Sequence, residues 1–243
     1  MTGLRSLAAN AAFFVWGVAI NLAWLPSLAL PRMATVRGQT IWAKGVLWLA
    51  RVTAGIRVEI RGAENLPNGP VLIACKHQSL WDTLIWHVIV RDPAIVMKAE
   101  LLNIPVYGWY CRKSKMIAIE RNAGPSALRK MVGAARAASH TGRPVIIFPQ
   151  GTRVAPGAGA PYLPGTAALY RALGAPCIPV ALNSGLFWPR RGFVRRPGTI
   201  VLEYLPPIPP GLRRREFMAL LEERIETAST ALIAPTEPGT RAA

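Results

Sequence analysis

The stretch VLIACKHQSLWDTLIWHVIV, residues 71–90, predicts a buried strand, a short polar loop and an apolar helix. Residues 71–75 form a continuous apolar run of strand length, and the helix is expected over residues 79–90. A strand without polar alternation is typical of a sheet covered on both faces. This unit therefore indicates an α/β layered fold.

The same alternation of short apolar runs and helical patterns continues along the chain. Further strands are expected at residues 56–62, 94–98, 115–120, 144–149, 177–183 and 199–205. Further helices are expected at residues 100–103, 106–113, 125–140, 164–174 and 213–233. Together these elements predict a layered α/β domain with a mostly parallel or mixed sheet flanked by helices.

The N-terminal segment differs in amino-acid composition from this domain. Residues 6–31 contain no charged residue, and a membrane span needs about 20 apolar residues. Asn10, Asn21 and Pro26 make a bent, partly inserted helix the alternative to a span. A signal peptide is a third possibility, although no clear A-x-A cleavage site follows the run.

A second N-terminal segment carries cations at a helical spacing. Arg37, Lys44 and Arg51 recur every seven residues, so they form one stripe on a helix, with apolar residues over much of the rest. The helix is either an ordinary core-facing one with a solvated stripe, or an interfacial one with its cations on lipid phosphates. We divide the chain into a membrane-associated helical segment, residues 1–55, and a second domain, residues 56–243.

The composition indicates an anionic partner. Lysine and arginine number 29 against 12 acidic residues, a net charge of +17. Such a charge suits nucleic acid, an anionic membrane surface or a phosphorylated substrate. Eight tryptophans favour the membrane, because Trp prefers the lipid–water interface. No nucleic-acid-binding module is recognisable, so we expect anionic membrane lipids and no nucleic acid as partners.

The cysteines point to a reducing compartment. Cys75, Cys111 and Cys177 are odd in number and form no C-x-x-C pair. They therefore suggest neither a disulfide framework nor a zinc site.

His77 is one of only three histidines and follows the strand at residues 71–75 by two positions, where α/β folds place their chemistry. Asp82 lies five residues further on. With Ser79 as its partner, Asp82 fits a helix-capping pattern. It could also bond one imidazole nitrogen and leave the other as a general base. Both interpretations stay open from these residues alone.

Two other strand ends carry polar residues. After the strand that ends at Pro149, Gly151 permits close backbone approach, while Thr152 and Arg153 offer a hydroxyl and a guanidinium, a combination that suits a phosphate. An ordinary turn is the alternative. Glu120 and Arg121 end the strand at residues 115–120 and would, taken singly, be an ordinary ion pair.

In this order, the motifs resemble those of the glycerophospholipid acyltransferases, most closely the 1-acyl-sn-glycerol-3-phosphate (lysophosphatidic acid) acyltransferase family. The family's first motif, N-H-x-x-x-x-D, is matched by His77 and Asp82, with Lys76 where Asn is commoner. Its second motif, an acidic residue followed by Arg, is matched by Glu120 and Arg121.

The third and fourth motifs follow in register. F-P-E-G-T-R is matched by FPQGTR, in which Gln150 replaces the glutamate and Gly151, Thr152 and Arg153 are retained. A V-P-V-like strand is matched by CIPVALNSG, which contains Pro179. The resemblance covers residues 56–205. The departure at Gln150 removes a carboxylate, whereas the one at position 76 is peripheral to the motif.

The resemblance implies transfer of a fatty acyl group from acyl-CoA or acyl carrier protein to the sn-2 hydroxyl of lysophosphatidic acid, with no metal and no cofactor. It implies that His77 is the general base and that Asp82 orients it. Backbone amides near the His77 loop are the candidates for stabilising the oxyanion. The substrate-binding residues that it implies are Glu120, Arg121, Gln150, Gly151, Thr152, Arg153 and, on the acyl side, Pro179.

Two rival functions stay open. One is the same chemistry on another lysolipid, such as a lyso-ornithine lipid, and the other is a non-enzymatic basic protein that binds membranes or nucleic acid. The cations that follow the uncharged run predict, by the positive-inside rule, a cell inner membrane location with the acyltransferase domain on the cytoplasmic face.

Overall fold

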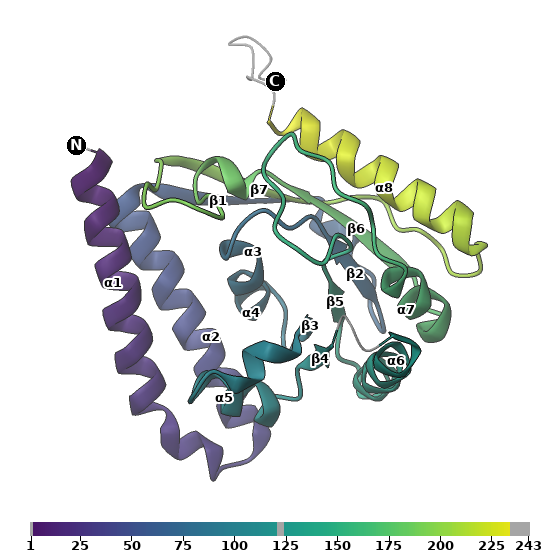
Figure 1. The fold of residues 1–243 in the computed structure, drawn as a ribbon, viewed down its shortest axis with the longest axis horizontal. Coiled ribbons are helices and arrows are strands. Elements are labelled where there is room, and N and C mark those ends of the chain that lie inside the picture. Colours follow the sequence, from purple (N-terminus) through teal and green to yellow (C-terminus); the bar gives the residue numbers. More distant parts are fainter. Residues whose placement is uncertain (1, 121–123, 234–243) are drawn as a thin grey trace.

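A seven-stranded mixed sheet forms the centre of the computed structural model, which describes residues 2–120 and 124–233 (Figure 1). The strand order is β1-β7-β6-β2-β5-β3-β4, and all neighbours are parallel except β6 and β7. The strands are β1 (Ile56–Arg61), β2 (Leu72–Cys75), β3 (Ala94–Lys98), β4 (Ile117–Ile119), β5 (Val145–Ile147), β6 (Cys177–Leu182) and β7 (Gly198–Tyr204). The predicted α/β layered fold with a mostly parallel, mixed sheet is confirmed.

Helices flank the sheet as expected, with one difference. They are α3 (Trp81–Leu84), α4 (Trp86–Ile89), α5 (Tyr107–Lys113), α6 (Gly124–His140), α7 (Gly165–Leu173) and α8 (Arg214–Ala231), with short 3-10 turns at Ala63–Asn65, Ala99–Asn103 and Ser184–Leu186. The helix expected at residues 79–90 is present from Trp81 to Ile89, but it is interrupted at Ile85, which divides it into α3 and α4. Trp81 and Trp86 are both completely buried, and five residues apart they would lie on different faces of one helix.

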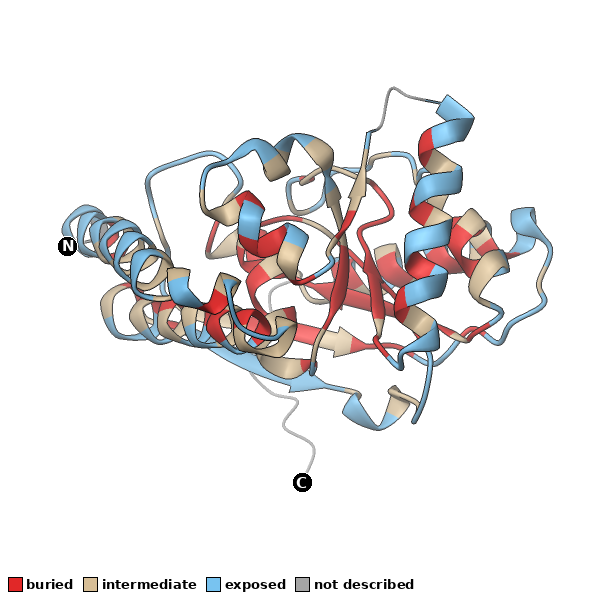
Figure 2. Ribbon diagram, turned by 90° about the horizontal axis from the view of Figure 1, so that it is seen from below, coloured by how far each residue is buried: buried red, intermediate tan, exposed pale blue. Residues whose placement is uncertain are grey.

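The core lies on both faces of the sheet, which explains the unbroken apolar strands. Along β2, Ile73 and Cys75 point into one hydrophobic cluster, and Leu72 and Ala74 point into the other. The first cluster is completed by α3, α4 and the N-terminal helices, and the second by α6, α7 and α8. Figure 2 shows these buried strands between helices whose outer faces are exposed.

The N-terminal segment is a helical hairpin and not one straight helix. Helix α1 (Thr2–Ala23) leads through a 3-10 turn (Leu25–Leu28) into α2 (Arg32–Leu49), which ends in a π-helical turn (Ala50–Ala54). The two helices pack closely, since a Cβ at Gly38 would collide with the ring of Trp24, and one at Gly45 would collide with the ring of Trp16. Of the three alternatives for residues 6–31, the bent helix fits this turn, which contains Pro26.

The cation stripe lies on the outside of this hairpin. Arg37, Lys44 and Arg51 are all exposed, as the seven-residue spacing predicts. Between them, Ile41 is 39% exposed and Trp48 is 62% exposed. This face of α2 therefore mixes cations with uncovered apolar side chains, while the opposite face packs on the sheet domain.

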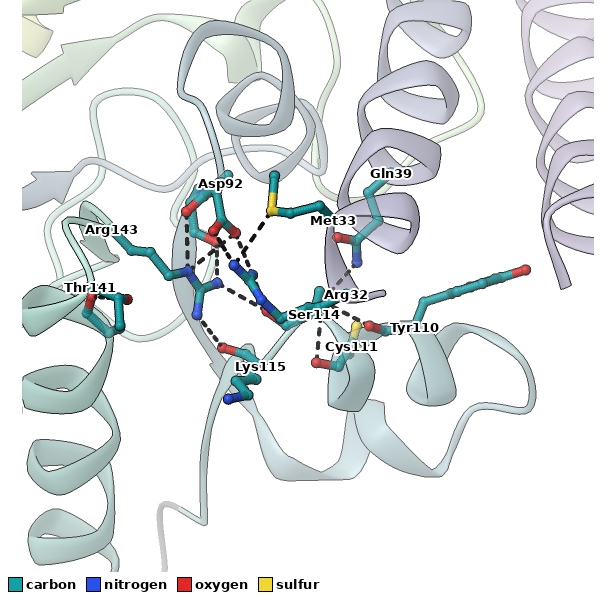
Figure 3. A network of polar contacts seen from close by, with 12 residues as sticks. Arg32, Met33, Gln39, Asp92, Tyr110, Cys111, Ser114, Lys115, Thr141 and Arg143 are labelled. Carbon is teal, nitrogen blue, oxygen red and sulfur yellow. Dashed lines mark hydrogen bonds and ion pairs between the residues drawn. The ribbon is translucent and has the colours of Figure 1, made fainter. Parts of the chain in front are cut away.

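A polar network fastens the hairpin to the sheet domain (Figure 3). Both terminal nitrogens of Arg32, at the start of α2, donate to the two carboxylate oxygens of Asp92, at 2.7 and 2.5 Å. Arg143, whose side chain is 6% exposed, pairs with the same carboxylate at 3.2 Å. It also donates to the backbone carbonyls of Pro93, Ser114 and Lys115. Burial lowers the pKa of Arg143, and Asp92 opposes that effect.

We expect Asp92→Asn to lower the free energy of unfolding by about 3 kcal/mol, because it leaves two guanidinium groups with no carboxylate between them. Asparagine tolerates the positive φ of 55° at this position, so the backbone is not the cause of the loss. The measurement is urea unfolding. Glu59→Gln, in the exposed pair with Arg61, serves as the control and should cost at most about 1 kcal/mol. Equal losses in the two variants would contradict the fastening role of Asp92.

Candidate active site

The structure joins the histidine and the aspartate of the first motif. His77 lies two residues beyond the end of β2, and its Nδ1 is 2.9 Å from Oδ2 of Asp82. The imidazole stacks on the ring of Phe148, with 4.2 Å between the ring centroids. The contact with Asp82 fixes one edge of the imidazole ring, and the stacking on Phe148 covers one of its faces. These two contacts leave Nε2 for the cavity that His77 lines.

Asp82 is completely buried, and the loop just before it supplies donors to its carboxylate. Oδ2 accepts hydrogen bonds from the backbone N–H groups of Gln78 and Ser79, at 2.6 and 2.7 Å. Ser79 Oγ in turn accepts from the N–H of Trp81 at 3.1 Å, which completes a reciprocal cap. The capping and orienting interpretations of Asp82 are therefore compatible, since one carboxylate oxygen makes both sets of contacts.

Ser184 completes the set of contacts and was not among the predicted site residues. Its hydroxyl donates to Oδ1 of Asp82 at 2.5 Å, from a position just beyond β6. The neighbouring N–H of Gly185 donates to Oε1 of Gln78 at 3.0 Å. The only signal in the sequence was the NSG that follows the fourth motif, and nothing in that triplet names its partner.

The amides nearest to His77 are already engaged. Because the N–H groups of Gln78 and Ser79 both point at Asp82, they are not available to a developing oxyanion. The expectation that amides of this loop stabilise the oxyanion is therefore wrong for these two. The physical reason is that a buried carboxylate needs donors of its own.

A large, mainly apolar cavity of about 1170 Å³ opens beside His77. One wall comes from the hairpin, through Phe13, Trp24 and Trp42. Such a volume exceeds what a compact polar substrate needs, and it suits a ligand with a long apolar part. The hairpin, which the sequence predicts to be membrane-associated, therefore also forms part of the site.

Residues of the third motif also line the cavity. Gly151, with a positive φ of 64°, makes the turn after β5 that brings Thr152 and Arg153 to the cavity wall. Glu120 also lines the cavity, from the end of β4. Arg190 lies beside them and donates to the backbone carbonyl of Arg153 at 2.8 Å, a cation that the motifs did not single out.

Two predicted residues, Gln150 and Pro179, are not among those that line the cavity. Gln150 is 5% exposed and directs its amide towards Glu226, away from the cavity. Pro179 is buried within β6 beside Ala74, so it supports the sheet and does not line the acyl side. The predictions that these two residues contact substrate are therefore not supported by their placement. Arg121 lies outside the described residues and stays a prediction.

Cysteine and metal chemistry find little support among the described residues. Cys75 is fully buried near Asp82, and burial raises the pKa of its thiol well above the ordinary value, which disfavours a nucleophilic thiolate. Within residues 2–120 and 124–233, no group of three or more His, Cys, Asp or Glu side chains is placed to hold a metal ion. The expectation that no metal or cofactor takes part stays a prediction.

Comparison with known proteins shows the family to which the chain belongs. The acyltransferase family model matches residues 57–183. The 1-acyl-sn-glycerol-3-phosphate acyltransferase of Pseudomonas aeruginosa is 35% identical over 238 residues, which are 98% of this chain and 91% of that protein. The chain belongs to the 1-acyl-sn-glycerol-3-phosphate acyltransferase family.

A mammalian relative and a solved structure are also similar to this chain over most of its length. The alpha enzyme of Mus musculus is 30% identical over 193 residues, 76% of this chain and 67% of its own length. The crystal structure of the 1-acyl-sn-glycerophosphate (LPA) acyltransferase PlsC from Thermotoga maritima superposes with a TM-score of 0.78 at 22% identity. The superposition covers 98% of this chain and 100% of the PlsC chain. The fold is therefore shared over the whole length, including the hairpin.

For this acyltransferase, we expect His77→Ala to abolish turnover while leaving the melting temperature within a few degrees. The imidazole is partly exposed at the cavity, and its loss leaves the buried Asp82 with its three other donors. The measurement is acyl transfer beside thermal unfolding. Ser184→Ala, which removes one donor from the same carboxylate, should keep part of the activity. Near-normal turnover without His77 would exclude it as the base.

Proposed function

We propose that this acyltransferase moves a fatty acyl group from a thioester donor, acyl-CoA or acyl carrier protein, to the sn-2 hydroxyl of 1-acyl-sn-glycerol-3-phosphate, which gives phosphatidic acid. One observation carries the proposal. His77, paired with Asp82, lines the same large, mainly apolar cavity as the Gly151–Arg153 turn, and its backbone carbonyl accepts a hydrogen bond from the N–H of Val154 at 2.8 Å. A base, an acyl-sized space and an anion-binding group therefore meet at one place, and the names of the curated relatives agree with that combination.

His77 acts as a general base in this reaction. As the sn-2 hydroxyl oxygen attacks the thioester carbonyl, its proton passes to Nε2, and Asp82 stabilises the resulting imidazolium through Nδ1–H. The tetrahedral intermediate then expels the thiolate, which takes the proton back from Nε2. Base catalysis by a positioned side chain is worth about 10²–10⁴-fold. Neither a metal nor a cofactor enters these steps.

The phosphate of the acceptor binds at the Gly151–Arg153 turn. Arg153 and the N–H and hydroxyl of Thr152 suit its oxygens, since a guanidinium binds phosphate through two parallel hydrogen bonds. Arg190 adds a second cation at the same rim. Arg121 is proposed to join them. Fixing the phosphate fixes which hydroxyl reaches His77.

We expect Arg153→Ala to raise the Michaelis constant for lysophosphatidic acid roughly tenfold or more, because a hydrogen bond to a charged group contributes about 1.5–3 kcal/mol. The Michaelis constant for the acyl thioester should change much less. Steady-state kinetics with each substrate varied in turn measures both.

Arg196→Ala is the matched control for charge. Arg196 is exposed on the same basic loop as Arg190 but does not line the cavity, so its removal should leave the acceptor's constant within about twofold. An unchanged acceptor constant in Arg153→Ala would contradict the phosphate site. It would favour an acceptor without phosphate, such as a lyso-ornithine lipid.

The hairpin supports a membrane location in which α1 enters one leaflet and does not cross. The segment at residues 3–23 is long and apolar enough to span a membrane. However, it is tied along its length to the sheet domain, through Asn10 to the carbonyl of Phe193 at 2.9 Å and through the carbonyl of Asn21 to Tyr110 at 2.6 Å. A crossing helix would draw the charged domain into the hydrocarbon.

We further propose that the leaflet is the cytoplasmic one of the inner membrane. The exposed cations of α2 would then meet anionic headgroups, as the positive-inside tendency favours. The outer face of α1 supplies the apolar contact. Along one side of the helix, Val15, Val18 and Leu22 are 70%, 60% and 55% exposed.

We expect the triple variant Val15→Gln, Val18→Gln, Leu22→Gln to lose membrane binding without unfolding. Each exposed side chain contributes about 1.5 kcal/mol when buried in lipid, so the affinity should fall roughly a hundredfold or more. The measurement is sedimentation with vesicles of anionic phospholipid. Ala219→Gln, on the exposed face of α8, is the control. Full binding by the triple variant would show that the cations alone suffice.

A further inference from the structure

An ion pair between a buried lysine and a glutamate whose side chain is 34% exposed lies directly behind the catalytic loop. The side chain of Lys76, the residue before His77, is only 2% exposed, and its Nζ contacts both carboxylate oxygens of Glu226 at 2.6 Å. Glu226 projects from α8, the C-terminal helix, 150 residues further along the chain. A lysine is almost never buried in this way unless its charge is paired. Lys76 therefore depends on Glu226.

The same carboxylate also reaches the second substrate loop. The amide nitrogen of Gln150, the residue before Gly151, lies 3.5 Å from Oε1 of Glu226. The hydroxyl of Tyr162 donates to the same oxygen at 2.8 Å. The long segment that follows the third motif is thereby attached to the same point. One carboxylate thus connects the residue that precedes the base with the residue that precedes the phosphate-binding turn.

The two positions that meet at Glu226 are the two at which this chain departs from its family's motifs. Position 76 carries a cation where the motif has an asparagine, and position 150 carries an amide where the motif has a glutamate. Each departure makes its position more positive by one charge. Glu226 contacts both side chains. Its carboxylate therefore lies beside position 150, where the family's third motif has a glutamate and this chain has a glutamine.

We propose that Glu226 is a positioning residue for acyl transfer, holding the His77 loop and the Gly151–Arg153 turn in register in place of the missing carboxylate at position 150. Glu226 touches no substrate, because neither it nor Lys76 lines the cavity. It acts on His77 through Lys76 and on Arg153 through Gln150. The inference rests on the proposed acyl transfer for its kinetic consequence, but the loop-holding role is a property of the free protein.

The first variant is Glu226→Gln, which keeps the shape of the side chain and removes its charge. We expect kcat to fall and the acceptor's Michaelis constant to rise, for a combined loss in kcat/KM of about a hundredfold, because both loops are displaced. The Michaelis constant of the acyl donor should change less. Glu223→Gln, which removes one charge from an exposed position of the same helix, is the control and should behave as wild type.

The decisive variant moves the carboxylate from position 226 to position 150. Gln150→Glu combined with Glu226→Gln places the negative charge on the other partner of the same contact, and we expect it to recover kcat/KM to within about tenfold of wild type. Lys76→Met combined with Glu226→Gln removes the unpaired ammonium as well as the carboxylate. It should fold well and remain impaired, which separates positioning from stability.

Hydrogen exchange tests the same role without any substrate. In Glu226→Gln, the amides of residues 76–79 and 150–154 should exchange at least tenfold faster, while those of β7 stay unchanged, and the relocated carboxylate should restore protection. Wild-type exchange in both loops, or wild-type kcat/KM in Lys76→Met with Glu226→Gln, would overturn the proposal. If the protein acylated no lysolipid, the proposed function would fail, and the exchange rates would still decide the role of Glu226.

Discussion

The carboxylate of Asp82 is the constraint on which the site depends. It is fully removed from water, and a buried charge is tolerated only when it is surrounded by donors. The donors come from the loop after β2 and from the segment after β6, through His77 and Ser184 among others. Satisfying one carboxylate therefore forces two strand ends into a single arrangement, with the imidazole at the wall of the cavity.

Consecutive residues of the catalytic loop serve opposite sides of the molecule. His77 faces the cavity, while Lys76 points back into the ion pair with Glu226. Extended backbone alternates its side chains in this way, so one short segment can belong both to the reacting site and to its support. At the third motif, a turn through Gly151 separates Gln150, whose amide points to Glu226, from Arg153, which lines the cavity.

The hairpin links membrane attachment to the shape of the site. Its inner face supplies apolar walls of the cavity through Phe13 and Trp42, and its outer face leaves Val15 and Val18 uncovered. Arg32 and Asp92 hold the hairpin to the sheet domain, so the two faces keep a fixed relation. The proposed membrane contact and the shape of the cavity therefore depend on the same two helices.

The sequence by itself determined the elements and the local chemistry. Strand and helix patterns depend on near neighbours, so local periodicity was enough to predict the alternation along residues 56–233. The bond between His77 and Asp82 was one of two interpretations of those residues, and only the resemblance to the acyltransferases favoured it. The break between α3 and α4 could not be predicted from local periodicity, because burial of Trp86 against Tyr204 is a tertiary contact. The tertiary structure alone decided which distant residues complete the site. Ser184 is 102 residues from Asp82, and Glu226 is 150 residues from Lys76. Such partners are set by how the crossovers bring strand ends and α8 together, and no local periodicity records that.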